Sequence, residues 1–126
     1  MHKSRLGVVV IDCQTDDLAG AAAFWGAALG CPAEDAPADG DENYLKLETP
    51  PDEVGVLLQK VDHPGRVHLD IETDDLEAEV KRLEELGAKR IAQVKTWWVM
   101  EAPTGQRFCV VQPQRPDFER GANVWE

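Results

Sequence analysis

The residues best suited to chemistry lie at corresponding positions of two similar segments. His68 and Asp70 share one face of a predicted strand, and Asp12 occupies the position of Asp70 at an offset of 58 residues. An imidazole with two carboxylates can hold a divalent cation, and two close carboxylates can do acid–base work because each raises the pKa of the other. A structural role is the third interpretation, since both aspartates precede helix starts and can stabilise turns. The sequence favours this structural role and leaves the other two open.

Three further positions are candidates for contact with a small molecule. Trp97 and Trp98 are adjacent on a predicted strand, so one ring faces a cavity and the other faces the helices. We assign Trp98 to the cavity, where it would stack on a flat ligand, although the sequence alone does not separate the two rings. Arg107 suits a carboxylate or phosphate, and Cys109 on the same strand face is more typical of a small buried hydrophobe than of a nucleophile.

The two segments belong to a longer internal repeat. Residues 11–18 match residues 69–76 with five of eight positions identical, and both copies continue into a helical pattern that ends in Leu-Gly. Residues 56–59 match residues 109–112 at an offset of 53. Three landmarks in the same order indicate an ancestral duplication.

Each half is predicted to fold as a βαβββ unit, although the strand before Tyr44 is poorly marked. The predicted strands cover residues 6–13, 44–48, 54–61, 66–72, 89–94, 96–101 and 106–112. The first helix is predicted over residues 18–29, after Asp16 or Asp17 and before Gly30. Residues 33–43 are predicted to form an acidic loop, and the tail over residues 113–126 has no predicted packing partner.

The second predicted helix has an apolar stripe and a charged face. Its stripe consists of Leu76, Val80, Leu83 and Leu86, and Gly87 ends it. Asp74 with Glu77 resembles a capping box. The charged face is predicted to be solvated and consists of Glu77, Glu79, Lys81, Arg82, Glu84 and Glu85.

Strand alternation separates a helix-facing surface from a trough. The aliphatic face of each repeat's first strand is predicted to pack against helices; it consists of Val9 and Ile11 in one repeat and Val67, Leu69 and Ile71 in the other. The opposite face carries Asp12, His68 and Asp70. Two such troughs side by side can bend into an incomplete barrel that holds a small molecule.

These features resemble those of the vicinal oxygen chelate superfamily, and in particular its short bacterial glyoxalase-like domain proteins. The resemblance covers about residues 6–113 and rests on the duplication and on Asp17-Leu18, Phe24-Trp25, Leu29-Gly30, Val67-His68-Leu69-Asp70, Leu86-Gly87-Ala88 and Pro103-x-Gly105. It implies an α+β fold in which two βαβββ repeats form an incomplete β-barrel. The whole chain, residues 1–126, would then be one domain with a C-terminal tail at 114–126, and a homodimer is the expected assembly.

The resemblance also implies where a metal would be held. The family's four ligand positions fall on His68, Val10, Cys109 and Val56, so only the histidine is retained. Because valine cannot coordinate a cation, we expect the fold and its cavity without the family's metal site, and no other cofactor.

Charge and cysteine usage exclude several classes of partner. The 126 residues carry a net charge of −11, with 43% hydrophobic and 29% charged residues. Such a chain is globular and ill-suited to nucleic acid or to an anionic membrane surface. The three cysteines form no CxxC motif, and no signal peptide or membrane span is predicted, so a cytoplasmic location is expected.

These observations favour a protein that binds a small aromatic or cationic molecule without the usual metal, in the manner of the family's drug-sequestering members. The alternative is a lyase, isomerase or dioxygenase with a displaced or incomplete metal site around His68. A regulatory module without turnover is the third possibility, and the sequence does not decide whether the protein is an enzyme.

Overall fold

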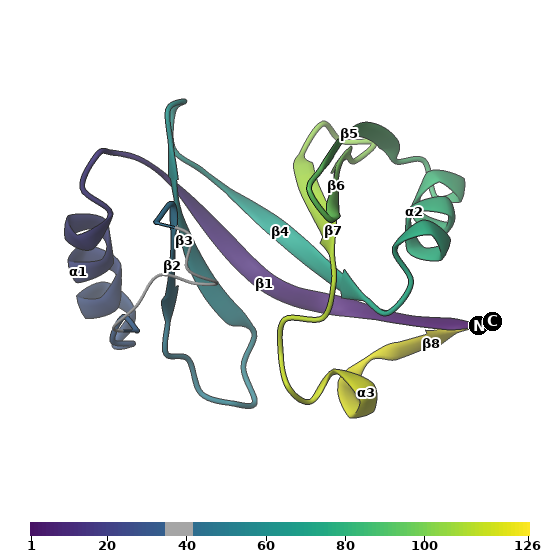
Figure 1. The fold of residues 1–126 in the computed structure, drawn as a ribbon, viewed down its shortest axis with the longest axis horizontal. Coiled ribbons are helices and arrows are strands. Elements are labelled where there is room, and N and C mark those ends of the chain that lie inside the picture. Colours follow the sequence, from purple (N-terminus) through teal and green to yellow (C-terminus); the bar gives the residue numbers. More distant parts are fainter. Residues whose placement is uncertain (35–41) are drawn as a thin grey trace. The chain divides into compact units, whose positions relative to one another are not determined.

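The computed structural model describes residues 1–34 and 42–126 (Figure 1). Its strands are β1 (His2–Gln14), β2 (Tyr44–Leu47), β3 (Gly55–Val61), β4 (Arg66–Thr73), β5 (Lys89–Val94), β6 (Trp97–Glu101), β7 (Arg107–Val111) and β8 (Asn123–Trp125). Its helices are α1 (Leu18–Leu29), α2 (Leu76–Glu85) and α3 (Phe118–Gly121). The strands belong to an open sheet, and the predicted α+β class is confirmed. Within the described ranges, no helix is both long and apolar enough to span a bilayer.

The chain divides into two compact units that follow the internal repeat. The first-repeat unit is Val9–Val67, and the second-repeat unit combines Met1–Val8 with His68–Glu126. Strand β1 contributes its beginning to the second-repeat unit and its end to the first-repeat unit.

The first-repeat unit packs α1 against β2 and β3. Its strand order is β2-β3-β1, and β2 is antiparallel to β3. Ala33 forms a single antiparallel bridge with Leu47, which is all that the described residues show of the poorly marked strand. Ala22, Leu47 and Leu58 form the buried core. The predicted acidic loop lies mostly in residues 35–41, outside the described residues.

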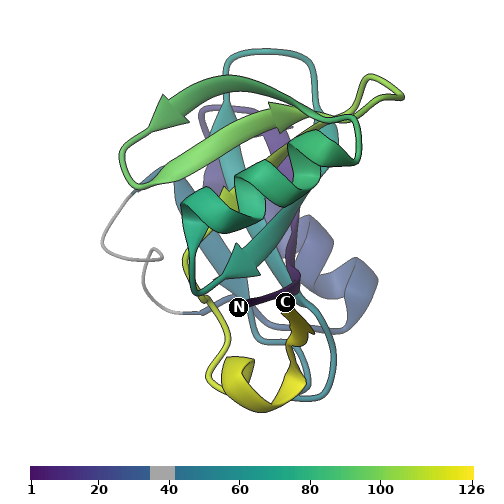
Figure 2. The ribbon, with the colours of Figure 1, turned by 90° about the vertical axis from the view of Figure 1, so that its right-hand side faces the viewer.

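The second-repeat unit has the corresponding order β4-β7-β6-β5. Strand β4 is parallel to β7, and the other neighbours are antiparallel. Figure 2 shows α2 lying across β5 and β6. The core beneath α2 forms where Val80 and Leu83 of the helix meet Met100 of β6 and Val110 of β7. Of the aliphatic β4 residues predicted to face the helices, Ile71 packs against this core. Leu69 is 46% exposed, and Val67, the last residue of the first-repeat unit, is 59% exposed, so the prediction is wrong for these two.

The C-terminal tail packs on the start of the chain, which the sequence did not reveal. Strand β8 is antiparallel to β1, with Trp125 opposite His2. This pairing explains why β1 begins at His2 rather than at the predicted residue 6. Phe118 of α3 is buried, at 4% exposure.

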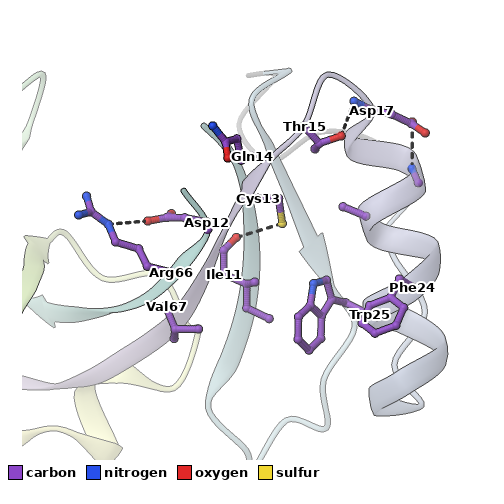
Figure 3. Close-up of a pocket in the computed structure, with 13 residues that line it drawn as sticks. Ile11, Asp12, Cys13, Gln14, Thr15, Asp17, Phe24, Trp25, Arg66 and Val67 are labelled. Carbon is purple, nitrogen blue, oxygen red and sulfur yellow. Dashed lines mark hydrogen bonds and ion pairs between the residues drawn. The ribbon is translucent and has the colours of Figure 1, made fainter. Parts of the chain in front are cut away.

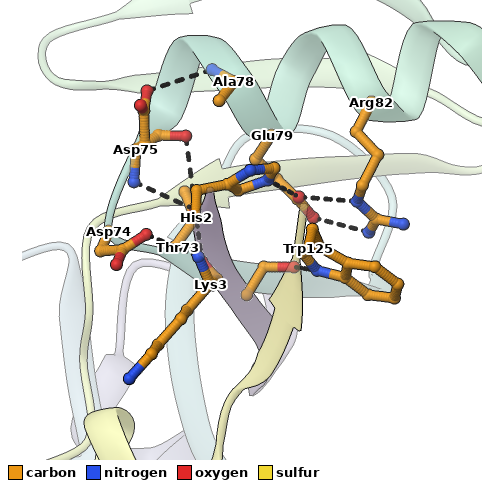
Figure 4. A network of polar contacts seen from close by, with 10 residues as sticks. His2, Lys3, Thr73, Asp74, Asp75, Ala78, Glu79, Arg82 and Trp125 are labelled. Atoms are coloured by element: carbon orange, nitrogen blue, oxygen red, sulfur yellow. Dashed lines mark hydrogen bonds and ion pairs between the residues drawn. The ribbon is translucent and has the colours of Figure 1, made fainter.

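The tail and β1 also cover part of α2, so one predicted surface position is wrong. Glu79, expected on the solvated face of the helix, is fully buried. Its carboxylate accepts hydrogen bonds from Arg82 and contacts His2, and the Arg82 guanidinium lies over the Trp125 ring (Figure 4).

The N-terminus of α2 is capped by Asp75 and not by the predicted Asp74. The Asp75 carboxylate accepts a hydrogen bond from the Ala78 N–H at 3.1 Å, whereas Asp74 accepts one from the Lys3 N–H at 2.8 Å. The sequence could not separate two adjacent aspartates, because the distinction depends on the distant strand β1.

We expect Asp75→Ala to lower the free energy of unfolding by about 1 kcal/mol, because an unpaired amide remains at the helix start. Asp75→Asn retains a side-chain oxygen at this position and should preserve most of the stability. Urea unfolding of the two variants tests this expectation. An equal loss in both variants would mean that the charge, and not the hydrogen bond, stabilises the helix.

Candidate functional site

Three metal-ligating side chains converge on one face of the second-repeat unit. His68 and Asp70 are two residues apart on β4, and Asp70 is the register partner of Cys109 on β7. His68 Nε2 lies 3.5 Å from Asp70 Oδ1. One potential ligand atom from each residue lies within 4.8 Å of the other two, and all three residues are half-buried. We call these three residues the His–Asp–Cys cluster.

The two tryptophans of β6 lie on opposite faces. Trp98 is the register partner of Val110, packs against the core beneath α2, and lies under the Arg90 guanidinium at 5.1 Å. The assignment of Trp98 to the cavity face is therefore corrected. Alternation along β6 places Trp97 with Val99, the register partner of Cys109, on the face of the His–Asp–Cys cluster.

Arg107 shares the face of Cys109 but is already paired. Its Nε atom donates a hydrogen bond to Glu101 Oε2 at 3.2 Å, and Glu101 is its register partner on β6. The positive charge expected at a cavity mouth is thus largely offset by a neighbouring carboxylate.

An open hollow of about 650 Å³ lies beside α1 in the first-repeat unit (Figure 3). We call it the α1 hollow; it is lined by Ile11, Asp12, Cys13, Gln14, Thr15, Asp17, Gly20, Ala21, Phe24, Trp25, Gly65, Arg66 and Val67. The rings of Phe24 and Trp25 meet edge to face, with centroids 5.1 Å apart. Phe24 is 63% exposed, so its ring is accessible to a ligand in the hollow.

The electrostatics of the α1 hollow are set by a few groups. The buried Asp12 carboxylate lies 3.5 Å from Arg66 Nε. Asp17 caps α1 by accepting a hydrogen bond from the Gly20 N–H at 3.0 Å. Burial raises the pKa of the Cys13 thiol, and the adjacent Asp12 charge raises it further, so this cysteine is a poor nucleophile.

The predicted site residues divide between the two units. The structure brings His68, Asp70 and Cys109 together in the second-repeat unit, while Asp12 belongs to the first-repeat unit. A shared role for Asp12 and Asp70 stays a prediction. The sequence analysis used Phe24-Trp25 only as a mark of the family resemblance and did not name the pair as site residues, although an adjacent Phe and Trp on an otherwise Ala-rich helix is a detectable signal.

The family's metal positions do not fit a cation in this chain. Val10 is 1% exposed, and Val56 packs against the core of the first-repeat unit. Neither side chain has a donor atom, so these two positions cannot ligate a cation. The His–Asp–Cys cluster includes Asp70, which is not one of the family's four ligand positions.

The chain is similar to known proteins in family and in fold. A family model described as a glyoxalase-like domain matches residues 8–111. No curated protein shows a significant match.

Several solved structures share the fold at low sequence identity. A methylmalonyl-CoA epimerase from Mycobacterium tuberculosis is 16% identical, with a TM-score of 0.63 over 86% of this chain and 87% of that chain. A hypothetical protein from Bacillus halodurans is 12% identical, with a TM-score of 0.64 over 89% and 96%. A glyoxalase/bleomycin resistance protein/dioxygenase superfamily member from Vibrio splendidus is 22% identical, with a TM-score of 0.50 over 81% and 96%. At these identities the similarity shows a shared fold.

Proposed function

Because the chain belongs to the glyoxalase-like domain family of the vicinal oxygen chelate superfamily, we propose that it binds a small aromatic cation in the α1 hollow. The observation that carries this proposal is the pairing of an exposed Phe24 ring with a half-buried Trp25 ring in a hollow that is also lined by the buried Asp12. The binding does not require the family's usual metal.

The size and lining of the α1 hollow support a small organic ligand. Its volume of about 650 Å³ is within the range of roughly 300–1,000 Å³ that is typical of ligand pockets. Two aromatic rings at right angles offer one face and one edge to a planar molecule. Aromatic faces also attract cations.

The charges favour a cation over an anion. The lining contains two carboxylates, Asp12 and Asp17, and one guanidinium, Arg66. The net charge of −11 on the chain raises the local concentration of cations around the protein. An anionic ligand would meet both carboxylates with only Arg66 to offset them.

The test compares N-methylquinolinium with 1-methylnaphthalene, its neutral counterpart of the same shape. In ¹⁵N-labelled protein, we expect the cation to shift the indole N–H signal of Trp25 in a saturable manner. The signal of Trp98, which is partly buried against the core of the second-repeat unit and does not line the hollow, should not move. Trp25→Phe assigns the signal. The neutral probe should bind about tenfold more weakly, which corresponds to about 1.4 kcal/mol.

Matched variants on α1 complete the experiment. Phe24→Ala should weaken binding of the cation, whereas Leu29→Ala should not, because Leu29 is also exposed but does not line the hollow. Asp12→Asn should remove the preference for the cation. The proposal is wrong if Trp25 shows no saturable shift, or if Phe24→Ala and Leu29→Ala behave alike.

An enzyme with a displaced metal site is the second candidate function. The His–Asp–Cys cluster favours it, because three protein donors are the usual number in a catalytic zinc site. A lyase, isomerase or dioxygenase activity would then depend on His68 and its neighbours, and not on the α1 hollow.

A further inference from the structure

We propose that His68, Asp70 and Cys109 bind a zinc ion within the second-repeat unit. The inference concerns a different part of the chain from the α1 hollow, so it does not rest on the binding of an aromatic cation. His68 and Cys109 occupy two of the family's four ligand positions, but Asp70 does not, so the proposed donor set differs from the family's and comes from one repeat alone.

The backbone places the three side chains on one face. Successive residues of a strand point to opposite faces, so His68 and Asp70 point the same way. Asp70 and Cys109 are register partners on the parallel strands β4 and β7, and side chains at matching positions share a face. Strands are rigid elements, so this face holds the donors with little freedom to separate.

The distances are close to those that a bound ion requires. Donor atoms at 2.0–2.3 Å from a tetrahedral zinc ion are separated from one another by roughly 3.5 Å. His68 Nε2 and Asp70 Oδ1 are already 3.5 Å apart. The whole cluster lies within 4.8 Å, so small side-chain rotations bring all three atoms to bonding distance.

The donor types select zinc among the common cations. Magnesium and calcium prefer sites composed of oxygen atoms, whereas an imidazole, a thiolate and a carboxylate together suit a borderline-soft ion. The three donors leave a fourth tetrahedral position for water or for an oxygen atom of a ligand. A zinc ion bound in this way would polarise that oxygen.

The surrounding charges permit a cation here. The Asp70 carboxylate and the Cys109 thiolate together match the double charge of the ion. The nearby Arg107 guanidinium is paired with Glu101, so its repulsion of a cation is offset. Metal binding should release a proton as the Cys109 thiol ionises.

The experiment uses Co²⁺ as a spectroscopic substitute for zinc in the full-length, metal-stripped protein. We expect one equivalent of Co²⁺ to produce the near-ultraviolet charge-transfer absorption of a thiolate ligand, and one equivalent of Zn²⁺ to remove it. An excess of Mg²⁺ should leave the absorption unchanged. Cys109→Ser should abolish the charge-transfer absorption, and Asp70→Asn should weaken Co²⁺ binding by at least about tenfold.

Matched controls use the other cysteines and histidines of the chain. Cys31→Ser, Cys13→Ser and His63→Ala should retain the absorption and the affinity, as should His2→Ala, which removes the histidine next to the N-terminus. Circular dichroism of each metal-free variant establishes that it is folded. The proposal is overturned if Co²⁺ does not bind, if the absorption survives Cys109→Ser, or if folded Asp70→Asn binds as tightly as the natural protein.

Discussion

Replacing Glu72 by alanine is expected to lower the free energy of unfolding by about 3–5 kcal/mol, the range for breaking a buried ion pair. Glu72 on β4 is fully buried, and its Oε1 accepts a hydrogen bond from Arg5 Nε at 2.7 Å. Its Oε2 accepts the backbone N–H groups of Gln114 and Arg115, at 2.8 and 3.2 Å. Alanine would leave these donors unpaired in the interior, which costs more than the ion pair alone.

This carboxylate also explains a glycine on the adjacent strand. A Cβ atom at Gly7 would lie 2.8 Å from Glu72 Oε2, closer than side chains pack. Within the second-repeat unit, this buried acid is therefore one of the contacts that fix the start of the tail, at Gln114 and Arg115.

Urea unfolding of Glu72→Ala at neutral pH tests this expectation, with Glu119→Ala as the control. Glu119 forms an ion pair with Lys3 but is 73% exposed, so its loss should leave stability nearly unchanged. A Glu72→Ala effect as small as that of the control would show that the tail is held by other contacts, such as the buried Phe118.

The elements that follow from local signals were predicted closely. Helix α1 begins and ends at the predicted residues, because Asp17 caps it and Gly30 adopts a φ of 71°, which glycine tolerates best. Strands β5 to β7 also lie within one residue of their predicted bounds. Alternation and turn residues determine these segments without help from distant parts of the chain.

The features that depend on distant pairing were not predicted. Strand β8 has three residues and gains its structure from β1. The burial of Glu79 has the same origin. In the candidate site, alternation placed His68 and Asp70 together, but the proximity of Cys109 depends on β4 pairing with β7. Residue spacing along the chain does not contain that information.

Glu79→Gln is expected to lower the free energy of unfolding at neutral pH by about 3 kcal/mol, because it removes the charge from a buried pair. The Glu79 carboxylate receives two hydrogen bonds from Arg82, each at 2.8 Å, and lies 2.8 Å from His2 Nε2 (Figure 4). Arg82 in turn lies 3.9 Å from the Trp125 ring, whose Nε1 donates to Ser4. The change should therefore loosen both chain ends.

The pH dependence of this variant separates charge from shape. Burial alone would raise the pKa of Glu79, but the hydrogen bonds from Arg82, His2 and Ser4 outweigh it and lower the pKa below its ordinary value. A depressed pKa in the folded state stabilises the protein above the unfolded-state pKa of about 4.3, and this stabilisation is lost as the pH falls through the folded-state value. The difference in stability between the natural protein and Glu79→Gln should therefore shrink in acid.

Urea unfolding at neutral pH and at successively lower pH measures that difference, with Glu77→Gln as a control on the same helix. Glu77 is 54% exposed and pairs with Arg90 at the surface, so its replacement should have little effect at neutral pH. A Glu79→Gln deficit that stays constant down to strongly acidic pH would mean that the carboxylate acts through its shape and hydrogen bonds. The charge would then contribute nothing to holding β1, β8 and α2 together.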